Sequence, residues 1–179
     1  MTWQTELVKR YPLLFQSDEP AHARGCPTVG DGWHLVVEKA IERIDAAVAG
    51  LPRGSLQIVQ IKEKFAGLRL YVEWAALLPE VAAKVQEAID LAEARSYCTC
   101  ETCGAVGRLY DDDGWFTTRC DRHAEGAPVP ATPGDDGLHI KFTVELGKMR
   151  VINCRRYDRE RDAFVDAPLP PGEEWAEER

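Results

Sequence analysis

The chain has 179 residues, 45% of them hydrophobic, which is ordinary for a soluble globular protein and enough to form a core without disulfides. Its formal net charge of −8 disfavours general nucleic-acid binding through neutralised phosphates. No stretch approaches the roughly eighteen apolar residues of a membrane span, and the N-terminal residues lack the apolar centre of a signal peptide. We therefore expect a cytoplasmic protein whose six cysteines are reduced thiols or metal ligands.

Two helices are expected near the N-terminus. Residues 5–15 predict a short helix that Pro12 ends or bends, and the turn-forming residues 16–32 predict a loop. A longer helix is predicted from Asp31, which suits the N-cap position, to a stop at Gly50. Its core-facing stripe, at helical spacing, consists of Trp33, Val37, Ile41, Ile44 and Val48.

A hairpin and a third helix follow. Apolar and polar residues alternate over residues 68–74, which predicts a half-buried strand, and the β-branched residues 56–62 predict its partner. The turn is expected near Phe65-Ala66-Gly67. Residues 79–96 predict a helix that begins at a proline, and its apolar face consists of Val81, Val85, Ile89 and Ala92.

The last part of the chain predicts a second hairpin and a tail. Residues 138–146 alternate cleanly, Gly147 and Lys148 turn the chain, and residues 149–157 return as the second strand. Residues 158–179 hold eight acidic residues against three arginines and predict an exposed, acidic, Pro-containing tail, in which only Trp175 is suited to docking. Helices with antiparallel hairpins and no βαβ alternation predict an α+β fold, with a single domain over residues 1–157.

The strongest chemical pattern lies in the knuckle segment, residues 97–124. Cys100 and Cys103 form a Cys-x-x-Cys pair, and sixteen residues later Cys120 and His123 form a Cys-x-x-His pair. This spacing predicts a tetrahedral zinc site with one Zn²⁺ per chain, whereas a set of reduced buried cysteines explains the two pairs poorly. Four protein ligands fill the tetrahedron, so we expect a structural ion and no catalytic residue.

The surroundings of the four ligands refine this expectation. The residues between the two pairs predict a hairpin with Asp113-Gly114 at its tip, and hence a zinc-ribbon or treble-clef-like knuckle inserted in the domain. Cys98 lies too close to Cys100 in sequence to share one ion easily, so we expect it to be a bystander. A zinc deaminase is excluded because its Cys-x-x-Cys pair must follow the His-x-Glu motif, and here it precedes it.

A second candidate site is the basic cluster Lys62, Lys64 and Arg69 at the predicted hairpin turn. One interpretation is a solvated hairpin end. The other is an anion-binding site, in which Gly67 allows a ligand to approach the backbone and Trp33 and Tyr71 add an aromatic face. Both interpretations stay open at this point.

Three stretches together resemble an uncharacterised protein family of tailed bacteriophages and prophages. They are GDGWHLVVEKAIERI, QIKEKFAGLRLYV and CETCGAVGRL…GWFTTRCDRH, and they cover roughly residues 5–124. Ala66 stands where that family tends to have glycine. The family has no assigned activity. By analogy with small phage accessory proteins, the resemblance implies a protein of the bacterial host cytoplasm that binds a host protein, such as an antiviral defence factor, or an anionic small molecule or nucleotide.

Two functional hypotheses from different classes follow. The first is a zinc-stabilised accessory binding protein without strong general nucleic-acid binding and without a membrane partner. The second is a metal-dependent, nuclease-like enzyme acting on nucleic acid, with the zinc knuckle as a structural part. That enzyme would need a histidine base beside a further metal site, whereas His22, His34 and His139 are isolated in the sequence.

Overall fold

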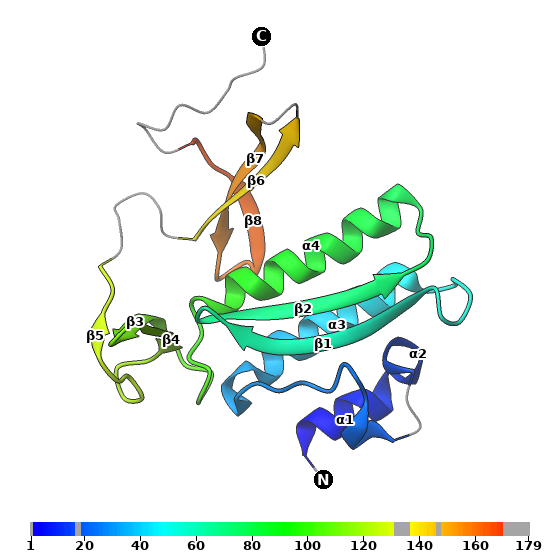
Figure 1. Cartoon of the computed structure of the whole chain (residues 1–179), viewed down its shortest axis with the longest axis horizontal. Helices are drawn as coiled ribbons and strands as arrows, with labels where there is room; N and C mark the ends of the chain where they lie inside the picture. The colour runs from blue at the N-terminus through cyan, green and yellow to red at the C-terminus, as the bar shows by residue number, and fades with distance from the viewer. Residues whose placement is uncertain (1, 17–18, 131–136, 146–147, 170–179) are drawn as a thin grey trace. The chain divides into compact units, whose positions relative to one another are not determined.

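The computed structural model describes residues 2–16, 19–130, 137–145 and 148–169. It has an α+β fold with antiparallel sheets (Figure 1). The chain forms two compact units, Met1–Val129 and Pro130–Arg179. This division differs from the expected single domain over residues 1–157, because among the described residues the last three strands pair only with one another.

The first unit contains the helices. They are α1 (Trp3–Arg10), α2 (Pro12–Phe15), the 3-10 helices η1 (Pro20–His22) and η2 (Asp31–Trp33), α3 (His34–Val48) and α4 (Pro79–Ser96). Pro12 separates α1 from α2, as expected, because proline is favoured at the start of a helix and disfavoured inside one. None of the helices in the described residues is both long enough and apolar enough to cross a membrane.

The start of α3 differs from the expectation at one residue. Asp31 makes no side-chain cap hydrogen bond to the helix. Its carboxylate instead accepts a hydrogen bond from Nε1 of Trp3, at 2.8 Å. The Asp31 carboxylate, which the sequence predicts to cap the helix backbone, is thus bonded to Trp3 of α1 instead. The short helix η2 leads directly into α3.

Strands β1 (Leu56–Lys64) and β2 (Gly67–Trp74) form an antiparallel hairpin. The two residues between them, Phe65 and Ala66, both have positive φ, at 53° and 62°. Positive φ at both central positions is the type I′ turn, which matches the twist of the flanking strands. The expected turn position is therefore confirmed.

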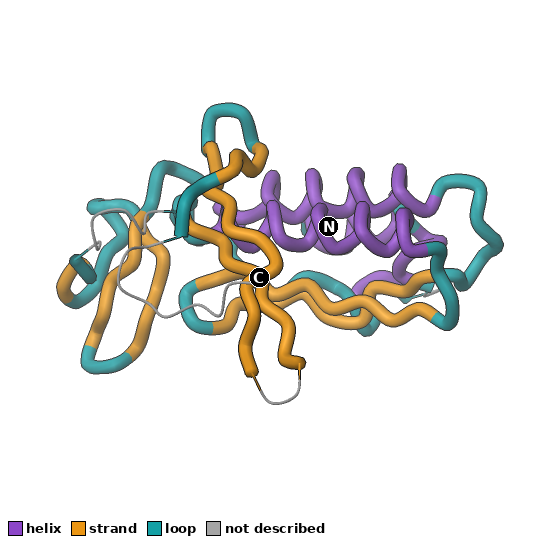
Figure 2. Tube along the Cα trace, turned by 90° about the horizontal axis from the view of Figure 1, so that it is seen from above, coloured by secondary structure: helices purple, strands orange, loops and turns teal. Residues whose placement is uncertain are grey.

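Helices α3 and α4 lie on one side of this hairpin (Figure 2). The core lies between these layers and also takes in α1 and α2. Its largest fully buried side chains are Trp33, Phe15, Leu7, Leu14, Ile41, Ile44, Ile58, Ile61, Leu68, Val8, Val37 and Val85. Most of the stripe predicted for α3 is therefore buried, and Val48 packs at the edge of the core.

The knuckle segment begins where α4 ends. Strands β3 (Arg108–Asp112) and β4 (Trp115–Arg119) form the predicted hairpin with Asp113 and Gly114 at its tip. A short strand, β5 (Ala127–Pro128), pairs with the other edge of β3. Its two residues carry no periodic signal, so the sequence did not predict it.

The second unit is an antiparallel sheet of β6 (Leu138–Glu145), β7 (Lys148–Asp158) and β8 (Ala163–Asp166), in that order. Strand β8 corrects the prediction that residues 158–179 form a tail throughout. The ring of Phe164 lies edge-on to Tyr157, and the Ala167 N–H donates to the Cys154 carbonyl at 3.1 Å. Gly147 and Trp175 lie outside the described residues.

Candidate metal centre

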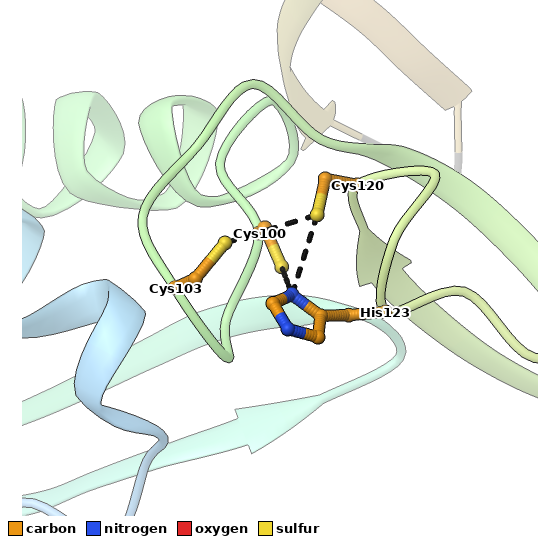
Figure 3. Close-up of side chains that lie close together, drawn as sticks. All are labelled: Cys100, Cys103, Cys120 and His123. Atoms are coloured by element: carbon orange, nitrogen blue, oxygen red, sulfur yellow. Dashed lines mark hydrogen bonds between the residues drawn. The ribbon is translucent and has the colours of Figure 1, made fainter.

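The four predicted metal ligands converge. Cys100 and Cys103 lie on the tight turn after α4, Cys120 directly follows β4, and His123 lies one turn further on. Their side chains point toward one another (Figure 3), and their ligand atoms all lie within 4.8 Å of one another. The Cys-x-x-Cys turn is closed by a 2.8 Å hydrogen bond from the N–H of Gly104, at φ +77°, to the Cys100 carbonyl.

The distances fit the edges of a metal-centred tetrahedron. Cys103 Sγ lies 3.7 Å from Cys120 Sγ. His123 Nδ1 lies 3.3 Å from Cys120 Sγ and 3.7 Å from Cys100 Sγ. Zinc–sulfur bonds of about 2.3 Å and zinc–nitrogen bonds of about 2.0 Å give edges of about 3.8 Å between sulfurs and about 3.5 Å between sulfur and nitrogen. Three sulfurs and one imidazole nitrogen therefore lie where one ion could bind them all.

The environment of Cys100 favours the metal-binding form of its thiol. The residue has no exposed surface. Burial of its sulfur would raise the pKa, but hydrogen bonds from the backbone N–H groups of Cys120 and Cys103 and from His123 lower it to about 6. The thiolate is the form that ligates metals, and the lowered pKa favours the thiolate of Cys100 at neutral pH.

Cys98 is not part of the cluster. It is half-buried, and its S–H donates to the Arg95 carbonyl at the end of α4, at 3.3 Å. The group of ligand atoms consists of Cys100, Cys103, Cys120 and His123 alone.

The backbone of the GDGW stretch packs directly against the Cys-x-x-Cys turn. The Gly32 N–H donates to the Glu101 carbonyl at 2.7 Å. A Cβ atom at Gly32 would lie 2.2 Å from the Cys100 carbonyl oxygen and 2.5 Å from the Cys103 nitrogen. Only glycine allows the two backbones to come this close. Trp33, next in the chain, donates from Nε1 to the Thr99 carbonyl at 2.7 Å and is fully buried.

The Glu101 carboxylate links three segments. One oxygen accepts the N–H of Gly30 at 3.0 Å, and the other accepts from Nη1 of Arg119 on β4 at 2.8 Å. The Glu101 and Arg119 side chains are only 14% and 22% exposed, so solvent screens the pair little. The turn, the GDGW stretch and β4 are thus held by one side chain.

The β1–β2 turn is attached to the same assembly. Thr118 on β4, which is 1% exposed, donates its hydroxyl to the Ala66 carbonyl at 2.8 Å. On the adjacent strand, the Leu68 N–H donates to Oγ of Ser96 at the end of α4, also at 2.8 Å. The KEKFAGLR stretch therefore rests on the knuckle segment and on α4.

Lys62, Arg69 and Tyr71 of the expected anion site are neighbours on the hairpin, where Lys62 and Arg69 are cross-strand partners, but Arg69 already has partners within the protein. Arg69 pairs with Glu93 on α4 at 2.8 Å and also donates to the hydroxyl of Tyr97 at 2.8 Å. The Lys62 ammonium lies 5.6 Å from the centre of the Tyr71 ring, and the Lys64 ammonium lies over the neighbouring ring of Phe65. Burial removes Trp33 from the surface, which corrects its expected role as an aromatic face for a ligand.

The sequence motifs predicted the four residues that converge here, but they gave no indication of Glu101, Thr118 and Ser96. Their roles depend on partners between 18 and 71 residues away along the chain. The one available signal was the pair of glycines in GDGW, because glycines flanking a helix start can indicate close backbone approach.

Comparison of the chain with protein-family models, curated proteins and solved structures gives no match. In the part of the chain that the structure describes, no other group of three or more His, Cys, Asp or Glu side chains converges in this way.

Proposed function

We propose that Cys100, Cys103, Cys120 and His123 bind one structural Zn²⁺. The observation that carries this proposal is the convergence of the four ligand atoms within 4.8 Å of one another, with three of the six edges at 3.3–3.7 Å, as one tetrahedral ion requires. Three thiolates and an imidazole suit zinc among the common divalent ions. Four protein ligands leave no open position for water, which is the arrangement of a structural site. The order of turn, hairpin and turn supports a zinc-ribbon or treble-clef-like knuckle.

In this proposal the ion holds more than the knuckle segment. The turn that carries Cys100 is bonded to the GDGW stretch, and the strand that leads to Cys120 is bonded to the β1–β2 turn. Zinc binding is therefore coupled to the packing of the whole first unit. Such a rigid body suits a binding protein, whose contact surface must be held in place before its partner arrives.

We propose a zinc-stabilised accessory binding protein of the bacterial host cytoplasm, in the phage or prophage setting that the resemblance implies. Its partner is a host protein. An anionic ligand at the hairpin receives less support, because Arg69 already pairs with Glu93 and Tyr97. No observation on the described residues favours the nuclease-like alternative.

Metal analysis together with chelation tests this proposal. The purified protein is expected to contain one zinc per chain, and a strong chelator is expected to lower its melting temperature and expose the knuckle segment to protease. A chain that contains no stoichiometric metal, or that keeps its melting temperature after complete zinc removal, contradicts the proposal. Cys98→Ser is the matched control, since this thiol lies outside the ligand group.

A further inference from the structure

Two hairpin turns of the first unit present aromatic rings side by side. Phe65 from the β1–β2 turn is 69% exposed, Trp115 at the start of β4 is 71% exposed, and its neighbour Phe116 is 40% exposed. Together with Glu63, Lys64 and Gly114 they line a groove of about 420 Å³. The buried bond between Thr118 and the Ala66 carbonyl fixes one turn against the strand of the other. We call this surface the aromatic groove.

The fold does not need an aromatic residue at Phe65. The position has φ 53°, where a bulky side chain is strained and asparagine or glycine is preferred. An exposed ring gains almost nothing from burial in return. A side chain that costs the turn stability and faces solvent is best explained by contact with another molecule.

The two charged residues that line the aromatic groove, Glu63 and Lys64, balance one another, and further acidic side chains lie beside it at the hairpin tip. The tip of the β3–β4 hairpin carries three consecutive aspartates, Asp111, Asp112 and Asp113, and the last two are exposed. Asp112 is the cross-strand neighbour of Trp115. The Glu63 carboxylate accepts the Ala66 N–H inside the turn, and Lys64, over the ring of Phe65, is the one cation among the residues lining the groove.

These charges argue against a second copy as the occupant. In a symmetric dimer the same patch meets itself, so the aspartates of both copies would face one another. Three exposed rings of about 150–250 Å² each also fall short of the roughly 800 Å² per partner of a standard interface. They match the anchor region of a smaller contact, where a few aromatic residues supply most of the binding energy.

We propose that the aromatic groove binds a basic, apolar segment of another protein. An aliphatic or aromatic side chain of that segment fills the groove between Phe65 and Phe116. A lysine or arginine lies across the Trp115 ring and pairs with Asp112 and Asp113, which combines cation–π attraction with a salt bridge. This inference rests on the proposed binding function and names the chemistry of its partner.

A displayed library of random peptides is the probe, selected against the zinc-loaded full chain and counter-selected against Trp115→Ala. The enriched peptides are expected to combine a large apolar residue with lysine or arginine. In titrations of one such peptide, Trp115→Ala and Phe65→Asn are expected to weaken binding about tenfold or more. Replacing Asp112 and Asp113 by asparagine is expected to weaken binding and reduce its dependence on salt.

Three controls keep the result specific. Leu35→Ala removes a side chain that is 67% exposed on α3, outside the aromatic groove, and should leave binding unchanged. Phe65→Asn should not lower the melting temperature, because asparagine suits positive φ. Zinc content is measured on every sample. A chain that binds the peptide but contains no zinc would contradict the proposed structural zinc site and would still support peptide binding at the aromatic groove.

Other outcomes overturn the inference. A zinc-loaded chain that enriches no peptide over the Trp115→Ala variant, or that enriches acidic peptides, does not have this specificity. Self-association that is lost in Trp115→Ala would assign the groove to a second copy of the chain.

Discussion

Gly32 and Cys100 lie in backbone contact, although 67 residues separate them along the chain. A methyl group at Gly32 would be 2.2 Å from the Cys100 carbonyl oxygen. The stretch that leads into α3 and the turn that carries two of the proposed metal ligands are therefore in direct backbone contact. A substitution at Gly32 should therefore affect the metal site as well as the stability of the protein.

Gly32→Ala should destabilise the protein and loosen the metal site together. The three atoms nearest to the added methyl group are all backbone atoms, which cannot rotate away as a side chain could. We expect a loss of about 1–3 kcal/mol in the free energy of unfolding, measured with urea, and faster zinc transfer to a chelator.

Gly50→Ala is the control for this substitution. A Cβ atom there meets nothing within 4 Å, but φ is +85°. It should cost about 1–2 kcal/mol through backbone strain alone and leave zinc transfer unchanged. Equal rates of zinc transfer to the chelator in Gly32→Ala and Gly50→Ala would show that the contact between Gly32 and the Cys-x-x-Cys turn does not support the metal site.

Substitutions of the proposed ligands should abolish zinc binding, whereas substitution of the neighbouring Cys98 should not. Cys100→Ser and His123→Ala remove a donor from the tetrahedron and should bind zinc weakly or not at all, with loss of structure in residues 97–124. Cys98→Ser should retain one zinc per chain, because its thiol bonds to the Arg95 carbonyl instead. Zinc loss in Cys98→Ser would mean that the ligand set is wrong.

Arg69→Ala should reduce stability more than an exposed arginine does. Arg69 and Glu93 are 21% and 31% exposed, so this pair lies between the exposed and the buried classes, and we expect a cost of about 1–3 kcal/mol. Arg24, paired with Glu73 at 62% and 61% exposure, is the matched control and should cost under about 1 kcal/mol.

Thermal melting with a nucleotide panel extends the Arg69 comparison to the anion-site hypothesis. A nucleotide that stabilises the parent chain but not Arg69→Ala would restore that hypothesis. We expect no such nucleotide, since the guanidinium already has carboxylate and hydroxyl partners.

Thr118→Val should release the β1–β2 turn from the knuckle segment. The substitution keeps the shape of a buried side chain but removes its hydrogen bond to the Ala66 carbonyl, for a cost of about 1–3 kcal/mol. Thr117→Val, at the half-buried neighbouring position, should cost less. Hydrogen exchange of the Ala66 and Leu68 amides should accelerate in Thr118→Val only, and unchanged exchange would argue that the turn holds itself.

Local patterns predicted much of the fold. The stripe of α3 and the turn at Phe65-Ala66 follow from residue spacing, and the convergence of the three cysteines and His123 follows from the two short motifs. The attachments between these parts did not follow. Glu101 and Thr118 act through partners on other segments, and no local signal distinguishes them from surface residues. Arg69 belongs to a basic cluster in the sequence, but its pairing with Glu93 and Tyr97 did not follow from that pattern. Asp31 is the clearest case in which a tertiary contact overrides a local pattern, because the helix cap that the sequence suggests is replaced by a hydrogen bond from Trp3.

X-ray absorption at the zinc edge of the intact protein would show the ligand shell itself. We expect one zinc per chain with three sulfurs at about 2.3 Å and one nitrogen at about 2.0 Å. A shell of four sulfurs would place Cys98 among the ligands, and an oxygen in the shell would indicate an open site. Either result, or the absence of zinc from the native protein, would contradict a closed structural centre formed by Cys100, Cys103, Cys120 and His123.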